Sequence, residues 1–158
     1  MANCVCEILV THTPLAAQVS DIACAGAVVD FWGIVRPLED GREIEGIDYE
    51  THREMAQHQL KQIAEQAAEQ FGLERVIVHH RIGFVAVGEA SLLVRVASSH
   101  RTEGFRANQW IVDALKKKVP IWKCPRFRPV AGIADGNTHS NQSIRSSTGP
   151  GSAIPATV

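Results

Sequence analysis

The chain has 158 residues, of which 45% are hydrophobic and 21% charged, and its formal net charge is −1. These values are typical of one ordinary globular domain and exclude a fibrous protein. No apolar run approaches the ~20 residues needed to cross a bilayer. Residues 1–15 lack the basic flank and long apolar core of a signal peptide. We therefore expect a cytoplasmic protein that does not associate with membranes.

Neither the cysteines nor the histidines have the spacing of a metal site. The histidines show no H-x-x-x-H pattern, and no C-x-x-C pair occurs among the four cysteines, which are Cys4, Cys6, Cys24 and Cys124. A structural zinc site needs such clustered ligands. We expect free, buried thiols, no metal and no other cofactor.

The N-terminal part alternates short β-rich runs with chain breaks. Residues 4–10 predict a strand, and residues 25–35, which are apolar, β-branched and aromatic, predict a central strand. Between them, Pro14 suits the first turn of a short helix whose apolar side would carry Leu15, Val19 and Ile22.

A β-hairpin is predicted next. Asp40-Gly41 is a hairpin turn signal, and residues 44–50 predict the return strand. Strict alternation of side chains along that strand puts Ile44 and Ile47 on opposite faces.

Two amphipathic helices follow, separated by strands. The first is predicted over residues 52–71, ended by Gly72, because apolar residues recur at three- and four-residue steps: Ala56, Leu60, Ile63, Ala64, Ala67 and Phe71. Residues 73–82 and 90–98 predict strands. The second helix runs up to Pro120 with a stripe made of Phe105, Asn108, Ile111, Val112 and Leu115.

The predicted elements indicate an α+β protein, with a mainly antiparallel or mixed sheet and helices packed on one face. Residues 121–127 add a short extended segment. From residue 129 onward the composition changes to Gly, Ser, Thr, Asn, Pro and Ala. Such a segment cannot bury enough apolar surface to offset its ordering entropy. We expect a domain at residues 1–128 and a flexible tail at 129–158.

A basic stretch at residues 98–128 predicts an anion-binding site. It contains eight lysines and arginines but two acids, in a chain that is nearly neutral overall. A concentration of positive charge attracts an anionic ligand. Because the stretch includes the end of a strand, a helix and a second extended segment, its cations are expected to converge on one pocket.

Two interpretations of His100 and Arg101 are open. Both residues stand where a strand passes into the second helix, and the free N–H groups of a first helical turn favour an anion such as phosphate. Alternatively, Ser99 or Thr102 caps the helix, and His100 and Arg101 make local contacts only.

The lysines near Pro120 are candidates for chemistry. Lys116 lies in the last turn of the predicted helix and Lys123 follows Pro120 and Trp122, so that a bend at Pro120 would bring both amines together. Neighbouring cations and apolar walls lower the pKa of an amine, which suits a lysine to proton transfer or nucleophilic attack. The alternative is that these lysines are only solvent-exposed cations at the C-terminal end of a helix, where positive charge is favourable, as we expect for Lys117 and Lys118.

Together these segments resemble the large, catalytic subunit of molybdopterin synthase. The matching segments occur in family order at residues 26–36 (GAVVDFWGIVR), 47–56, 76–89 (VIVHHRIGFVAVGE) and 94–123 (VRVASSHRTEGFRANQWIVDALKKKVPIWK). The resemblance implies an α/β hammerhead fold and a homodimer at the centre of a heterotetramer. It also implies a small ubiquitin-like sulfur-carrier subunit, whose C-terminal Gly-Gly thiocarboxylate supplies sulfur to cyclic pyranopterin monophosphate to form the molybdopterin dithiolene. By analogy, pockets are shared at the dimer interface.

When the family's functional residues are assigned to the matching positions of this chain, the resemblance implies that Lys116 is the principal catalytic lysine and Lys123 its partner. It implies that the substrate-binding residues are Ile34, Val35, Arg36, His100, Arg101, Lys116, Lys123, Cys124 and Pro125, with Ile34 and Val35 acting through their backbones. Family members usually carry a basic or polar residue and then an acid where this chain has Cys124 and Pro125.

Three other functions compete with this one. A nucleic-acid or other anion-binding module would explain the basic stretch, although no basic-aromatic motif is present; we expect no nucleic-acid partner. A scaffold that only holds a carrier protein would not need both lysines. A thiol-relay sulfurtransferase would use Cys124, whose cationic neighbours favour a reactive thiol.

Overall fold

The computed structural model describes residues 4–16 and 24–130. The helix predicted after Pro14 falls largely on residues 17–23, and nearly all of the predicted tail on residues 131–158, so both lie outside the described residues. Residues 14–16 are not helical.

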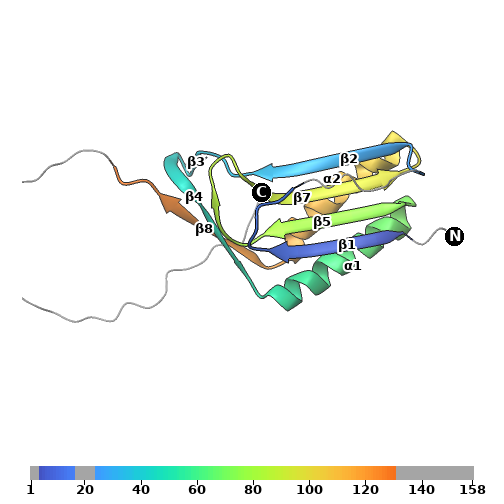
Figure 1. The fold of residues 1–158 in the computed structure, drawn as a ribbon, viewed down its shortest axis with the longest axis horizontal. Coiled ribbons are helices and arrows are strands. Elements are labelled where there is room, and N and C mark those ends of the chain that lie inside the picture. Colours follow the sequence, from blue (N-terminus) through green and yellow to red (C-terminus); the bar gives the residue numbers. More distant parts are fainter. Residues whose placement is uncertain (1–3, 17–23, 131–158) are drawn as a thin grey trace, which may run out of the picture.

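The larger sheet is mixed, as predicted. It contains β1 (Val5–Thr11), β2 (Ala27–Ile34), β5 (Arg75–Arg81) and β7 (Ala90–Ser98) in the order β1-β5-β7-β2 (Figure 1). β1 and β5 are parallel, whereas β5–β7 and β7–β2 are antiparallel. The apolar strands β5 and β7 occupy the centre.

The prediction that residues 25–35 form a central strand was wrong, because β2 is an outer strand. Val29 and Phe31 alternate with Val28, which is 45% exposed, and with Asp30. Asp30 forms an ion pair with Arg95 of β7 at 2.7 Å. An apolar composition alone cannot distinguish a strand buried on both faces from one that buries a single face.

A smaller sheet is built around β4 (Arg42–Thr51). It pairs with β3 (Leu38–Glu39), with β6 (Gly83–Ala86) and with β8 (Ile121–Phe127). The predicted turn is confirmed: Asp40 (φ 50°) and Gly41 (φ 74°) join β3 to β4, and positive φ at both positions fits the twist of a two-residue hairpin. The chain returns to β4 from far along the sequence, since Tyr49 lies opposite Lys123 of β8.

A β-bulge corrects the predicted faces of β4. The register against β8 shifts between Ile44 and Gly46, so that Glu45 is an extra residue. The extra residue resets the alternation, and Ile44 and Ile47 are both buried in the core. Strict alternation had placed them on opposite faces.

The first long helix, α1 (Arg53–Phe71), is confirmed. Its N-cap is His52, whose Nδ1 accepts a hydrogen bond from the Met55 N–H at 3.4 Å, and Gly72 ends it in the left-handed conformation (φ 64°). Its buried residues are those of the predicted stripe, Ala56, Leu60, Ile63, Ala64 and Ala67.

The second long helix, α2 (Arg101–Lys118), buries the predicted stripe except Phe105. Gly104 and Ala107 are buried with Asn108, whereas Phe105 is 62% exposed. A Cβ on Gly104 would lie 3.1 Å from Val29 of β2 and 2.9 Å from the Ser98 hydroxyl. The helix therefore approaches the sheet along its small residues, which turns Phe105 outward.

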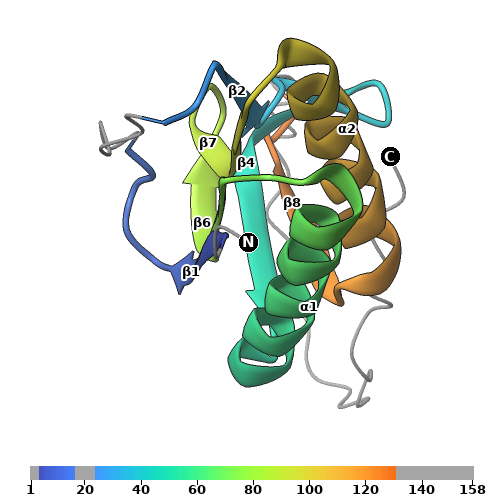
Figure 2. The ribbon, with the colours of Figure 1, turned by 90° about the vertical axis from the view of Figure 1, so that its right-hand side faces the viewer.

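Both helices pack side by side against one face of the larger sheet, as predicted (Figure 2). α1 lies over β1 and β5, and α2 lies over β7 and β2. The core forms in this layer, and the cavity described below lies where it meets the smaller sheet. In the described part of the chain, no helix combines the length and apolarity required to span a membrane.

Candidate functional site

A cavity of about 390 Å³ lies between the C-terminal ends of β2 and α2 and the smaller sheet. Three of its lining residues are cations, Arg36, Lys116 and Lys123. Among residues 4–16 and 24–130, no carboxylate lies within ion-pairing distance of any of the three. Three unneutralised cations around one cavity create a positive potential that attracts anions.

Arg36 is carried by the chain just after β2. The preceding residue, Val35, is buried, and its backbone N–H donates to the Glu89 carbonyl at 3.0 Å while its carbonyl accepts from the Gly88 N–H at 2.9 Å. Ile34 lines the cavity, but Val35 does not. The backbone N–H and carbonyl of Val35 are thus both engaged within the chain and hold the segment that carries Arg36.

The two lysines reach the cavity from α2 and β8, on either side of Pro120. Lys116 lies in the last turn of α2, which closes with a hydrogen bond from the Val119 N–H to the Leu115 carbonyl at 3.0 Å. Lys123 lies on β8 opposite Tyr49 of β4. The bend at Pro120 thus brings both lysines to one cavity.

Aromatic and apolar side chains form the rest of the wall. Phe31 and Trp32 contribute from β2, Tyr49 from β4, and Leu115, Val119 and Ile121 from the α2–β8 connection. Trp122, the expected apolar neighbour of Lys123, does not line the cavity, because successive residues of a strand face opposite sides. The cavity therefore combines positive charge with flat apolar surfaces, which suits an anionic ligand that also has an aromatic ring.

His80 and Tyr49 are cavity residues that the sequence analysis did not assign. His80 is 6% exposed, and its ring contacts that of Tyr49 edge to face, with centroids 5.4 Å apart. Burial lowers the pKa of His80 to about 4; the Arg81 carbonyl opposes this shift and the charge of Lys123 adds to it. Burial raises the pKa of Tyr49. The signal in the sequence was an ionisable residue at the end of an otherwise apolar strand.

The buried His80 predicts an acid-sensitive fold. In the unfolded chain His80 has its ordinary pKa of 6.5, whereas in the folded chain its pKa is about 4. Between these two pH values the unfolded chain binds a proton that the folded chain does not, so the free energy of unfolding decreases as the pH falls from 6.5 to 4. We expect His80 to account for a loss of about 3 kcal/mol between pH 7 and pH 4. Urea unfolding at both values should show a smaller loss for His80→Gln. The exposed control His58→Gln on α1 should behave like the wild type, and equal losses in all three proteins would contradict the prediction.

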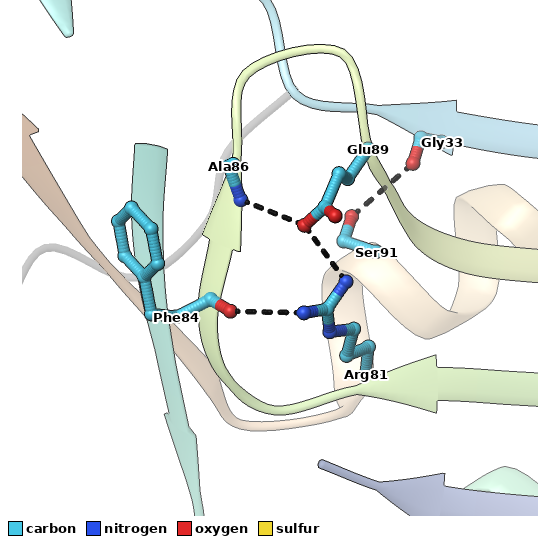
Figure 3. Close-up of polar contacts among 6 residues, drawn as sticks. All are labelled: Gly33, Arg81, Phe84, Ala86, Glu89 and Ser91. Carbon is cyan, nitrogen blue, oxygen red and sulfur yellow. Dashed lines mark hydrogen bonds and ion pairs between the residues drawn. The ribbon is translucent and has the colours of Figure 1, made fainter. Parts of the chain in front are cut away.

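A hydrogen-bonded loop supports this side of the cavity (Figure 3). The Arg81 guanidinium donates to Glu89 Oε2 at 2.9 Å and to the Phe84 carbonyl at 3.4 Å, and the Ala86 N–H donates to the same Glu89 oxygen at 3.1 Å. The Ser91 hydroxyl donates to the Gly33 carbonyl at 3.3 Å. The Glu89 contacts fix the β6–β7 loop, and the Ser91 contact joins β7 to β2 beside the edge that carries Ile34 and Arg36.

His100 and Arg101 do not reach this cavity within the chain. They lie at the N-terminal end of α2, whereas Lys116 is about 22 Å further along the helix axis at 1.5 Å per residue. The expected convergence of all the cations in residues 98–128 is therefore wrong for a single chain. Neither proposed cap forms: His100 is the N-cap without a side-chain hydrogen bond, and the Ser99 hydroxyl donates to Glu74 at 3.0 Å.

Cys124 and Pro125 follow Lys123 on β8 but do not line the cavity. Cys124 lies opposite Asp48, a residue paired with Arg126, and Pro125 lies opposite Ile47. Cys124 is a free, partly buried thiol. The prediction that the cysteines are buried is wrong most clearly for Cys24, which is exposed. Among the described residues, no three His, Cys, Asp or Glu side chains are grouped as a metal site requires.

Comparison with known proteins identifies the family. The model of the MoaE protein family matches residues 8–118, which is more than half of the chain and includes Arg36 and Lys116. A molybdopterin synthase catalytic subunit of Pyrococcus abyssi is 43% identical over 98 residues, covering 62% of this chain and 66% of the relative. Another, of Thermoplasma volcanium, is 39% identical over 115 residues, covering 73% and 81%.

The fold agrees with that assignment. The crystal structure of molybdopterin synthase from Staphylococcus aureus has a TM-score of 0.68 and 31% identity, and the match covers 77% of this chain and 90% of that one. The expected fold class is thereby confirmed. The family model, the two sequence relatives and the solved structure agree. The two relatives are named as molybdopterin synthase catalytic subunits, and this chain belongs to the MoaE protein family.

Proposed function

We infer that this chain is the catalytic subunit of a cytoplasmic molybdopterin synthase, a sulfurtransferase of molybdenum cofactor biosynthesis. One observation carries the inference: Arg36, Lys116 and Lys123 line a single cavity with aromatic walls and have no carboxylate partner among the described residues. Cyclic pyranopterin monophosphate offers the matching chemistry, since it joins a negatively charged phosphate to a flat heterocycle.

The three cations have different roles in this proposal, according to their chemistry and to how the backbone holds them. Arg36 is fixed through the Val35 backbone, and a guanidinium is suited to hold a phosphate through paired hydrogen bonds. Lys116 and Lys123 are amines, which exchange protons more readily than a guanidinium. Lys116 serves as general acid and base while the C–S bonds form, and Lys123 stabilises the accumulating negative charge.

The sulfur donor is the C-terminal Gly-Gly thiocarboxylate of a small ubiquitin-like carrier subunit. A thiocarboxylate brings a further negative charge into the cavity, where the same cations attract it. Two successive carriers supply the two sulfurs of the dithiolene.

The proposed function is tested by turnover. The purified chain should convert cyclic pyranopterin monophosphate to molybdopterin when it is supplied with thiocarboxylated carrier. The carrier with an ordinary C-terminal carboxylate is the matched control and should give no product. Binding of carrier without product in the first reaction would instead identify a non-catalytic scaffold.

We further propose that the chain forms a homodimer, at the centre of a heterotetramer, in which His100 and Arg101 complete the cavity of the partner subunit. Three observations support this arrangement. Both residues are exposed, both lie too far from their own cavity, and Phe105 one turn further along α2 is 62% exposed. An exposed aromatic side chain beside an imidazole and a guanidinium is typical of an interaction surface.

Mixed dimers test this arrangement. Lys116→Ala and Arg101→Ala homodimers are each expected to be impaired, because every cavity carries one defect. A heterodimer purified through two different tags has both defects in one cavity and none in the other, so it should recover about half of the wild-type rate. If each cavity took both residues from the same chain, the heterodimer would not exceed the mean of the two homodimers.

A further inference from the structure

The orientation of the His80 ring is fixed by its surroundings. Its Nδ1 lies 2.8 Å from the Arg81 carbonyl oxygen. A carbonyl oxygen only accepts hydrogen bonds, so Nδ1 carries the proton. A neutral imidazole has one donor and one acceptor, which leaves the lone pair on Nε2. This nitrogen is on the side of the ring away from that carbonyl.

The backbone that holds His80 is itself anchored. Arg81 supplies the accepting carbonyl, and its guanidinium is bonded to Glu89 and to the Phe84 carbonyl (Figure 3). Tyr49 packs edge to face against the imidazole, with the two ring planes at 71°. The ring is therefore held by a hydrogen bond and by an aromatic contact, and it lines the cavity with Nε2 as its acceptor.

Lys123 is the adjacent donor. It lies directly opposite Tyr49 in the β4–β8 register, and it lines the same cavity as Tyr49 and His80. Its ammonium group has three donors and, within the described residues, no carboxylate to receive them. The other titratable groups at the cavity, Arg36, Tyr49 and Lys116, carry N–H or O–H donors. His80 thus supplies the ring acceptor in a site otherwise rich in donors.

We propose that His80 is a positioning residue for Lys123: its Nε2 accepts a hydrogen bond from the Lys123 ammonium group and orients that group during sulfur transfer. The proximity of the two groups is supported by the effect of Lys123 on the pKa of His80, which is lowered to about 4 mainly by burial and further by the lysine charge. At neutral pH the imidazole is consequently uncharged and accepts a hydrogen bond without repelling the ammonium. This proposal rests on the proposed function for its kinetic consequence, but not for its geometry.

Two amide variants distinguish the roles of the two ring nitrogens of His80. His80→Asn keeps an amide nitrogen near the position of Nδ1 and removes Nε2, whereas His80→Gln places an amide near Nε2. We expect His80→Asn to lower kcat by about tenfold to a hundredfold with little change in KM, which is the cost of misplacing a catalytic group. His80→Gln should recover most of the loss.

A double-mutant cycle shows whether His80 acts through Lys123. In a Lys123→Met background, measured by single-turnover kinetics, His80→Asn should have an effect of no more than about twofold. An equal loss in both backgrounds would overturn the proposal, because His80 would then act independently of Lys123. Wild-type rates for both His80 variants would overturn it as well.

A measurement without turnover tests the geometry alone. Nitrogen-15 NMR of histidine-labelled protein should show that His80 carries its proton on Nδ1, and Lys123→Met should raise the pKa of His80. A proton on Nε2, or an unchanged pKa, would overturn the proposal even in an active enzyme. Conversely, an inactive wild type with the expected spectra would refute the proposed function and leave the His80–Lys123 pairing intact.

Discussion

Replacing Lys116 by alanine is expected to reduce sulfur transfer by about 10²-fold to 10⁴-fold, the usual contribution of general acid–base catalysis. The lysine lies in the last turn of α2 and faces the cavity together with Lys123 and Arg36. Its side chain is exposed apart from this contact, so that truncation removes the amine without disturbing the core. The rate of molybdopterin formation under single-turnover conditions, with the enzyme and the carrier in excess over the pterin, measures the loss.

The neighbouring Lys117 provides the matched control. It has the same side chain on the same helical turn, is exposed and does not line the cavity. Lys117→Ala should therefore keep nearly the full rate, and both variants should unfold at the wild-type urea concentration. A Lys116→Ala enzyme as fast as Lys117→Ala would remove Lys116 from the mechanism.

Asn108→Leu is expected to destabilise the fold by about 2–4 kcal/mol, since buried carbonyls that lose their donor incur a desolvation cost. Asn108 is 5% exposed. Its side-chain amide donates to the Val29 carbonyl at 3.1 Å and to the Val94 carbonyl at 2.9 Å. One amide group on α2 thus holds β2 and β7 together, and a leucine of similar size offers no donor to either strand.

Urea unfolding measures this effect against Gln109→Leu. Gln109 is the next residue of α2 and is exposed, so its replacement introduces the same side chain without disturbing a buried carbonyl. We expect that control to change stability by less than about 0.5 kcal/mol. A similar midpoint for both variants would mean that the two amide hydrogen bonds contribute no net stability.

Local sequence signals predicted the parts of the fold that depend on local interactions. The stripe and Gly72 located α1, and Asp40-Gly41 located the hairpin turn. The errors lie where distant segments decide the outcome. The outer position of β2 depends on pairing with β7, the bulge at Glu45 depends on β8, and the outward position of Phe105 depends on how closely Gly104 approaches β2.

For the candidate site too, the sequence identified some of the cavity residues and missed those whose role depends on distant segments. The sequence singled out Arg36, Lys116 and Lys123, which the structure brings to one cavity. It did not assign a role to His80, because the importance of a buried histidine depends on what lies beside it in space. It also grouped His100 and Arg101 with the lysines, although a rigid helix holds these pairs apart at its two ends.

The pairing of β4 with β8 determines when the cavity can form during synthesis. Tyr49 leaves the ribosome long before Lys123, its opposite neighbour, and the intervening chain contains α1, β5, β6, β7 and α2. Long-range pairing of this kind forms late because the loop must first be closed. A nascent chain that has already buried most of its core therefore still lacks one wall of its cavity, and binding competence is acquired only with the last strand of the domain.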